Sequence, residues 1–179
     1  MNRDYFIFKE ILSGDDYKKL KANQKYILAL MYSFMNNYNQ LIVQQNEIVR
    51  LANVSRETFR QSKRMLKDHN LIEYTYYSKV HLKISENLEK VYIHEALVNG
   101  QYSHLSNGAK LFYSYFLDEQ NKLNESCIKY TLSDIMNEFG GTYNTIETFC
   151  RELIQEDLLV KKKVDVSYLY HFKEIQEKV

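Results

Sequence analysis

The chain has 179 residues, a formal net charge of +1 at pH 7, 45% hydrophobic residues and 26% charged residues, a composition typical of an ordered globular protein and not of a disordered one. The apolar run YFIF at residues 5–8 is far too short for a signal peptide or a membrane span, and the two cysteines, Cys127 and Cys150, are too few for a disulfide framework. We therefore expect a cytoplasmic protein that is neither exported nor anchored in a membrane.

The first half of the chain reads as a helix, a short strand, a second helix and a tight turn. Asn23 is suited to cap the first helix, whose apolar residues are separated by three and four positions, which predicts one buried face. A short strand is expected at QLIV, residues 40–43, followed by a brief helix over residues 45–53 and a tight turn at Val54. The apolar residues of the first helix are Ile27, Leu28, Leu30, Met31 and Phe34.

A third helix and a hairpin complete this half. Ser55 can cap the helix, and Asn70 is suited to end it in the left-handed conformation. The apolar and aromatic segment at residues 71–84 then predicts two strands joined by a turn near Ser78 and Lys79, because β-branched and aromatic residues favour strands.

The two halves of the chain resemble each other. Glu10, Leu12, Tyr17, Leu20 and Lys25 match Glu95, Leu97, Tyr102, Leu105 and Lys110 at a constant offset of 85. Ile48, Thr58, Arg64, Leu66 and Leu71 match Ile135, Thr145, Arg151, Leu153 and Leu158 at an offset of 87. We therefore interpret the chain as two copies of one domain, residues 1–88 and 89–179, with a two-residue insertion in the second.

The second copy repeats the elements of the first. The sequence predicts helices over residues 107–121, 132–139 and 142–157, a strand near 128–130 and a hairpin over 158–172. Thr131 and Asp134 have the spacing of a capping box, with Asp in place of the usual Glu.

This order of elements is that of a winged helix-turn-helix domain. We therefore predict an α+β fold that is mainly α, made of two tandem winged helix-turn-helix domains that form an internal pseudo-dimer. Because duplicated domains retain the packing of a symmetric dimer, we expect a monomer with internal pseudo-two-fold symmetry.

The helix after the tight turn carries the candidate DNA contacts of the first domain. It has five basic residues against two acidic ones, Glu57 and Asp68. Four of the five basic residues lie on the face opposite Phe59 and Leu66, whereas the stem of Lys63 lies along the inward face. In a winged helix this helix lies in the major groove, and the hairpin lies along the DNA backbone. The predicted contacts are Ser55, Arg56, Glu57, Arg60, Gln61, Arg64, Lys67 and Lys79.

The corresponding helix of the second domain is poor in basic residues. Between residues 142 and 157 only Arg151 is basic, and residues 1–89 and 90–179 carry net charges of +4 and −3 (14 Lys+Arg against 10 Asp+Glu, then 10 against 13). We therefore expect the first domain to supply most of the affinity for DNA. The predicted contacts here are Thr142, Tyr143, Asn144, Thr148, Arg151, Lys161, Lys162 and Lys163.

The sequence also resembles a known family. Residues 96–121, ALVNGQYSHLSNGAKLFYSYFLDEQN, and 133–160, SDIMNEFGGTYNTIETFCRELIQEDLLV, resemble the amino-terminal winged-helix domain of plasmid replication initiators of low-GC Gram-positive bacteria. The tandem layout is similar to that of the internal-dimer accessory protein of Gram-positive conjugative plasmids. These resemblances imply a sequence-specific double-stranded DNA-binding protein of a plasmid or mobile element, with plasmid transfer or replication proteins as further partners.

Other functions are weighed against this one. Winged helices also serve as protein–protein adaptors, and the acidic second half is suited to such a role. The histidines lack the spacing of a metal site, so we expect no bound metal. There is no glycine-rich phosphate loop or nucleophile motif, so we expect neither a cofactor nor an enzymatic activity.

Overall fold

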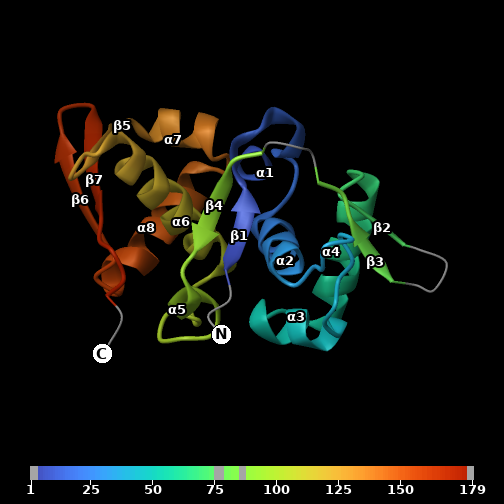
Figure 1. Cartoon of the computed structure of the whole chain (residues 1–179). Coiled ribbons are helices and arrows are strands. Elements are labelled where there is room, and N and C mark those ends of the chain that lie inside the picture. Colours follow the sequence, from blue (N-terminus) through green and yellow to red (C-terminus); the bar gives the residue numbers. More distant parts are fainter. Residues whose placement is uncertain (1–3, 75–78, 85–87, 177–179) are drawn as a thin grey trace.

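The computed structural model describes residues 4–74, 79–84 and 88–176. These form an α+β fold in which helices and small antiparallel sheets alternate along the chain, as predicted (Figure 1). The first half contains β1 (Tyr5–Phe8), α1 (Lys9–Ser13), the 3-10 turn η1 (Asp15–Tyr17), α2 (Ala22–Ser33), α3 (Gln45–Leu51), α4 (Arg56–Asp68), β2 (Ile72–Tyr74) and β3 (Val80–Leu82). The second half contains β4 (Lys90–Ile93), α5 (Glu95–Val98), α6 (Asn107–Leu123), β5 (Ile128–Tyr130), α7 (Leu132–Glu138), α8 (Tyr143–Gln155), β6 (Leu159–Val164) and β7 (Ser167–Phe172).

A strand pair that the sequence analysis did not anticipate joins the two halves. β1 and β4 pair in antiparallel fashion, with Tyr5 opposite Ile93 and Phe8 opposite Lys90. Moving each residue to its repeat equivalent at the offset of 85 converts the first of these pairs into the second. Residues 90–93 are the repeat equivalents of residues 5–8, so the two strands that pair are copies of one segment. Figure 1 shows this pair at the centre of the molecule, with the hairpins β2–β3 and β6–β7 at opposite ends.

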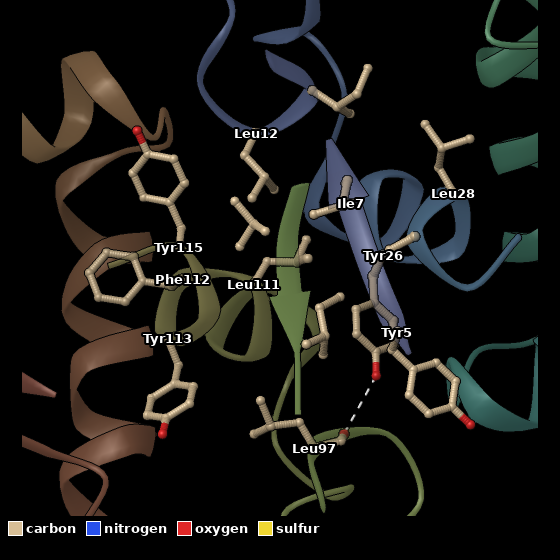
Figure 2. Close-up of a cluster of buried hydrophobic side chains, with 14 of the residues drawn as sticks. Tyr5, Ile7, Leu12, Tyr26, Leu28, Leu97, Leu111, Phe112, Tyr113 and Tyr115 are labelled. Atoms are coloured by element: carbon tan, nitrogen blue, oxygen red, sulfur yellow. Dashed lines mark hydrogen bonds between the residues drawn. The ribbon is translucent and has the colours of Figure 1, made fainter. Parts of the chain in front are cut away.

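Helices α2 and α6 pack on each other beside this strand pair. Residues 24–32 of α2 are all buried, and not only one face as expected, because β1, α3, α4 and α6 all contact the helix. Figure 2 shows Tyr26 of α2 and Leu111 of α6 in the shared core, where the Tyr26 hydroxyl donates a hydrogen bond to the carbonyl of Leu97 at 3.5 Å. A single apolar core therefore spans both halves.

The expected cap of α2 was wrong. The residue before the helix is Lys21, whose backbone N–H donates to the Gln24 side chain at 2.8 Å, as in half of a capping box. Asn23 lies in the first turn of α2, and its side-chain oxygen accepts a hydrogen bond from Asn107 of the other half at 2.9 Å. Asn23 therefore links the two halves and does not begin the helix.

Two lysines at matching repeat positions are buried in this core. Lys25 donates from Nζ to the carbonyl of Leu12 at 2.8 Å, and Lys110 donates to the carbonyl of Ser103 at 2.7 Å. The Lys110 ammonium also lies 5.0 Å from the centre of the Tyr26 ring. Burial lowers the pKa of both lysines to about 8.

Among the described residues, the two hairpins belong to sheets of different size, two strands in the first half and three in the second. In the second half the strand order is β5–β7–β6, so the predicted strand and hairpin form one sheet. In the first half the expected strand QLIV is reduced to single bridges, of Gln40 to His81 and of Leu41 to Met35. The Leu41 N–H also donates to the carbonyl of Val80 at 3.0 Å. The expected turn residue Ser78 lies outside the described residues.

Along the described ranges, no helix is both long enough and apolar enough to cross a bilayer.

Candidate nucleic-acid interface

Local caps fix α4 where the sequence predicted it. The Ser55 hydroxyl accepts a hydrogen bond from the Thr58 N–H at 3.0 Å, and Asn70 ends the segment with φ 58°. Phe59 and Leu66 are buried, so the opposite face of the helix is directed to solvent. Six predicted contact residues lie exposed on this helix: Arg56, Glu57, Arg60, Gln61, Arg64 and Lys67.

The charges on this exposed face are only partly neutralised within the protein. Glu57 forms an ion pair with Arg60 at 2.8 Å and accepts a hydrogen bond from Gln61 at 3.2 Å. The side chains of Arg56 and Arg64 make no hydrogen bond or ion pair with another described residue. These two guanidinium groups are therefore available to an anionic partner.

The hairpin after α4 lies against the same helix. The ammonium groups of Lys63 and Lys67 each lie 5.6 Å from the centre of the Tyr74 ring on β2. Lys63 also donates to the Gln45 side chain at 2.7 Å, and burial lowers its pKa. Lys79, at the start of β3, is exposed. Two basic residues of α4, Lys63 and Lys67, therefore lie against the hairpin.

Helix α8 repeats this geometry with uncharged residues. Gly140 and Gly141 adopt φ of 85° and 95° in the turn before it, and the Thr142 hydroxyl accepts from the Thr145 N–H at 3.4 Å. The predicted contacts Thr142, Tyr143, Asn144, Thr148 and Arg151 are all exposed. This face can donate hydrogen bonds, but it carries a single basic residue.

The four acidic residues of this segment are all engaged within the protein. Glu147 pairs with Lys161, and Glu152 accepts the Ser106 N–H at 2.8 Å. Glu156 lies 3.0 Å from the His104 ring nitrogen, and Asp157 pairs with Lys173. These acidic side chains are therefore held by partners within the protein. Less unpaired negative charge lies on α8 than the net charge of the second half suggests.

The three lysines of β6 are not equivalent. Lys162 and Lys163 are exposed. Only 9% of the Lys161 side chain is exposed, and its ammonium lies 4.3 Å from the centre of the Tyr168 ring as well as against Glu147. Lys161, predicted as a DNA contact, is therefore engaged within the protein, and the exposed lysines of β6 are Lys162 and Lys163.

One exposed basic segment was not among the predicted DNA contacts. Lys18, Lys19 and Lys21 of the first half line a cleft of about 270 Å³ together with Gly141 and Thr145 of the second half. The basic run KKLK at residues 18–21 is visible in the sequence. Its position beside the turn before α8 depends on a contact between the two halves, which the sequence does not predict.

Over the described ranges, these surfaces give no support for metal binding or for a reactive Cys150 thiol. Within the described residues, no group of three or more His, Cys, Asp and Glu side chains is placed to hold a metal ion. Cys150 lies on the buried face of α8, and this burial raises the pKa of its thiol to about 11. Such a thiol is packed as a small apolar side chain.

No protein-family model, no curated protein and no solved structure matches this chain.

Proposed function

We propose that this protein binds double-stranded DNA through two winged helix-turn-helix units related by a pseudo-two-fold axis, with α4 and α8 as recognition helices. The exposed face of α4 carries this proposal, because Arg56 and Arg64 are held on a capped, rigid helix and have no internal partner among the described residues. Arginines in this position can bind guanine edges in the major groove or phosphates beside it.

The shared element order supports the same reading. In both halves a short helix, a tight turn and a longer helix precede an antiparallel hairpin: α3, α4 and β2–β3, then α7, α8 and β6–β7. The antiparallel pairing of β1 with its repeat equivalent β4 supports a two-fold arrangement, in which the two units would bind related half-sites. The resemblance to plasmid proteins supports a role in conjugation, replication or transcription control.

Selection from a random duplex library, followed by binding measurements over a salt series, tests the proposal. We expect the chain to enrich a specific sequence and its affinity to fall steeply with salt. Arg56→Ala and Arg64→Ala should each weaken binding by roughly 1–3 kcal/mol and relax the base preference at one position if they read bases. Equal binding by the wild type and both variants would contradict the assignment of α4.

A second candidate function rests on the apolar residues of α8. Tyr143 is 56% exposed and Ile154 is 46% exposed, so α8 presents two large apolar side chains to solvent. An adaptor would use this helix to bind a protein and would show only weak, sequence-independent affinity for DNA. The same library selection separates the two functions, because an adaptor enriches no sequence.

A further inference from the structure

The cleft between η1–α2 and the turn before α8 joins residues from opposite halves. The first half contributes Lys18, Lys19 and Lys21. The second half contributes Gly140 and Gly141 of the turn before α8 and Thr145 of its first turn. Lys19 and Lys21 are exposed, and neither forms an ion pair with another described residue. Lys18 is paired with Asp15 at 2.5 Å.

The matching positions in the other half carry no such charge. At the repeat offset of 85, Lys18, Lys19 and Lys21 correspond to Ser103, His104 and Ser106. Ser103 and His104 line a related cleft of about 320 Å³ with Asn53, in the turn before α4. The His104 ring is engaged with Glu156, and the Ser106 hydroxyl caps α6. Each recognition helix therefore begins beside a segment of the opposite half, but only the segment beside α8 is rich in lysine.

The lysine-rich segment lies beside α8, whereas the basic residues of the helices themselves are concentrated on α4. Helix α4 carries Arg56, Arg60, Arg64 and Lys67 on its exposed face, whereas α8 carries only Arg151. A unit that binds duplex DNA needs cations near the phosphates on both sides of the groove. The helix that lacks such cations is the one that receives them from the other half.

We propose that Lys19 and Lys21 bind the DNA phosphates that flank α8, so that the second DNA-binding unit is completed by the first half of the chain. This inference rests on the proposed function. It assigns the two lysines to phosphate contacts, which position the protein and carry no base preference. It also replaces the expectation that the first unit provides most of the salt-dependent affinity.

The test uses the full chain and the duplex selected by the wild type. Lys19→Gln and Lys21→Gln should each reduce the slope of log affinity against log salt by about 0.9, and the double variant by about 1.8. The preferred sequence should stay unchanged. Lys129→Gln is the matched control, because Lys129 is exposed on β5, the edge strand of its sheet away from β6, which packs on α8. This control should leave the slope unaltered.

Phosphate ethylation interference then locates the lost contacts. We expect the double variant to lose interference in one half-site and Arg56→Ala to lose it in the other. If the double variant keeps the wild-type slope and interference while Arg56→Ala weakens binding, this inference fails and the proposed function stands. Binding of inorganic pyrophosphate is measured on the same proteins. If the wild type binds pyrophosphate and the double variant loses that binding but keeps wild-type DNA binding, the cleft is a small-anion site and this inference is overturned. A wild-type chain that selects no duplex would overturn the proposed function itself.

Discussion

Lys161 of β6 and Glu147 of α8 form an ion pair that lies partly beneath the surface, with the Lys161 ammonium 4.3 Å from the centre of the Tyr168 ring. The hairpin is thereby attached to the helix it follows. Of three consecutive lysines, one is engaged within the protein and two are exposed, although the sequence presents them as a single basic run.

The first prediction separates these lysines. Lys161→Gln should lower the free energy of unfolding by roughly 1–3 kcal/mol, because Glu147 loses a charged hydrogen-bond partner. This variant should leave the salt dependence of DNA binding unchanged. Lys162→Gln and Lys163→Gln should do the opposite, with each flattening the salt slope by about 0.9 at unchanged stability. Urea unfolding and binding over a salt series measure the two effects. A similar loss of slope in all three variants would show that the ion pair opens on DNA.

What the sequence predicted correctly is mostly local. The limits of α4 follow from Ser55 and Asn70, whose capping effects depend on the nearest few residues. The capping box of Thr131 and Asp134 was confirmed for the same reason. Such signals require no knowledge of the rest of the fold.

What the sequence did not predict depends on contacts between distant segments. The run YFIF becomes a strand because it pairs with residues 90–93, and a four-residue apolar run without alternation does not identify that partner. Lys161 is withdrawn from solvent by Glu147, and Asn23 bonds to Asn107, in both cases through tertiary contacts. The basic run at residues 18–21 acquires its neighbour in the same way.

The second prediction concerns the acidic residue within the basic face of α4. Glu57→Gln removes the partner of Arg60 and a negative charge that would face DNA. We therefore expect tighter binding and a salt slope steeper by up to about 0.9, the value for one additional phosphate contact. Asp68→Asn, at the far end of the same helix, is the control and should change the slope less. Weaker binding of Glu57→Gln at one base pair only would show instead that Glu57 accepts a hydrogen bond from cytosine.

The third prediction tests the close approach of α6 to α8. A Cβ added to Gly108 would lie 2.1 Å from the ring of Phe149, which is itself packed near Phe112. Gly-to-Ala changes inside helices are usually stabilising. Here we expect Gly108→Ala to destabilise the protein by about 1–3 kcal/mol, because the ring must be displaced. Thermal unfolding with Asn137→Ala, an exposed change in α7, as control provides the measurement. A raised melting temperature for Gly108→Ala would contradict the packing of these helices.

The last prediction follows from the two buried lysines. The pKa of Lys25 and that of Lys110 are lowered by burial from 10.5 to about 8. Above pH 8 the folded protein therefore releases protons that the unfolded chain still holds, and the free energy of unfolding rises with pH. Ionisation of Cys150 in the unfolded chain, half complete at pH 9, opposes this rise increasingly as the pH is raised, because burial raises its folded pKa from 9.0 to about 11. The rise is therefore clearest between pH 8 and pH 9.

Over that interval we expect the free energy of unfolding to increase by up to about 2 kcal/mol, the combined effect of two lysines. Urea unfolding at pH 7, 8 and 9 measures it. Lys25→Met and Lys110→Met should each remove about half of the increase, and the double variant should remove nearly all of it. Lys129→Met, which alters an exposed lysine, should leave the pH dependence intact. If stability instead stayed constant or fell between pH 8 and pH 9 in the wild type, the two ammonium groups would have to be solvated in the folded protein.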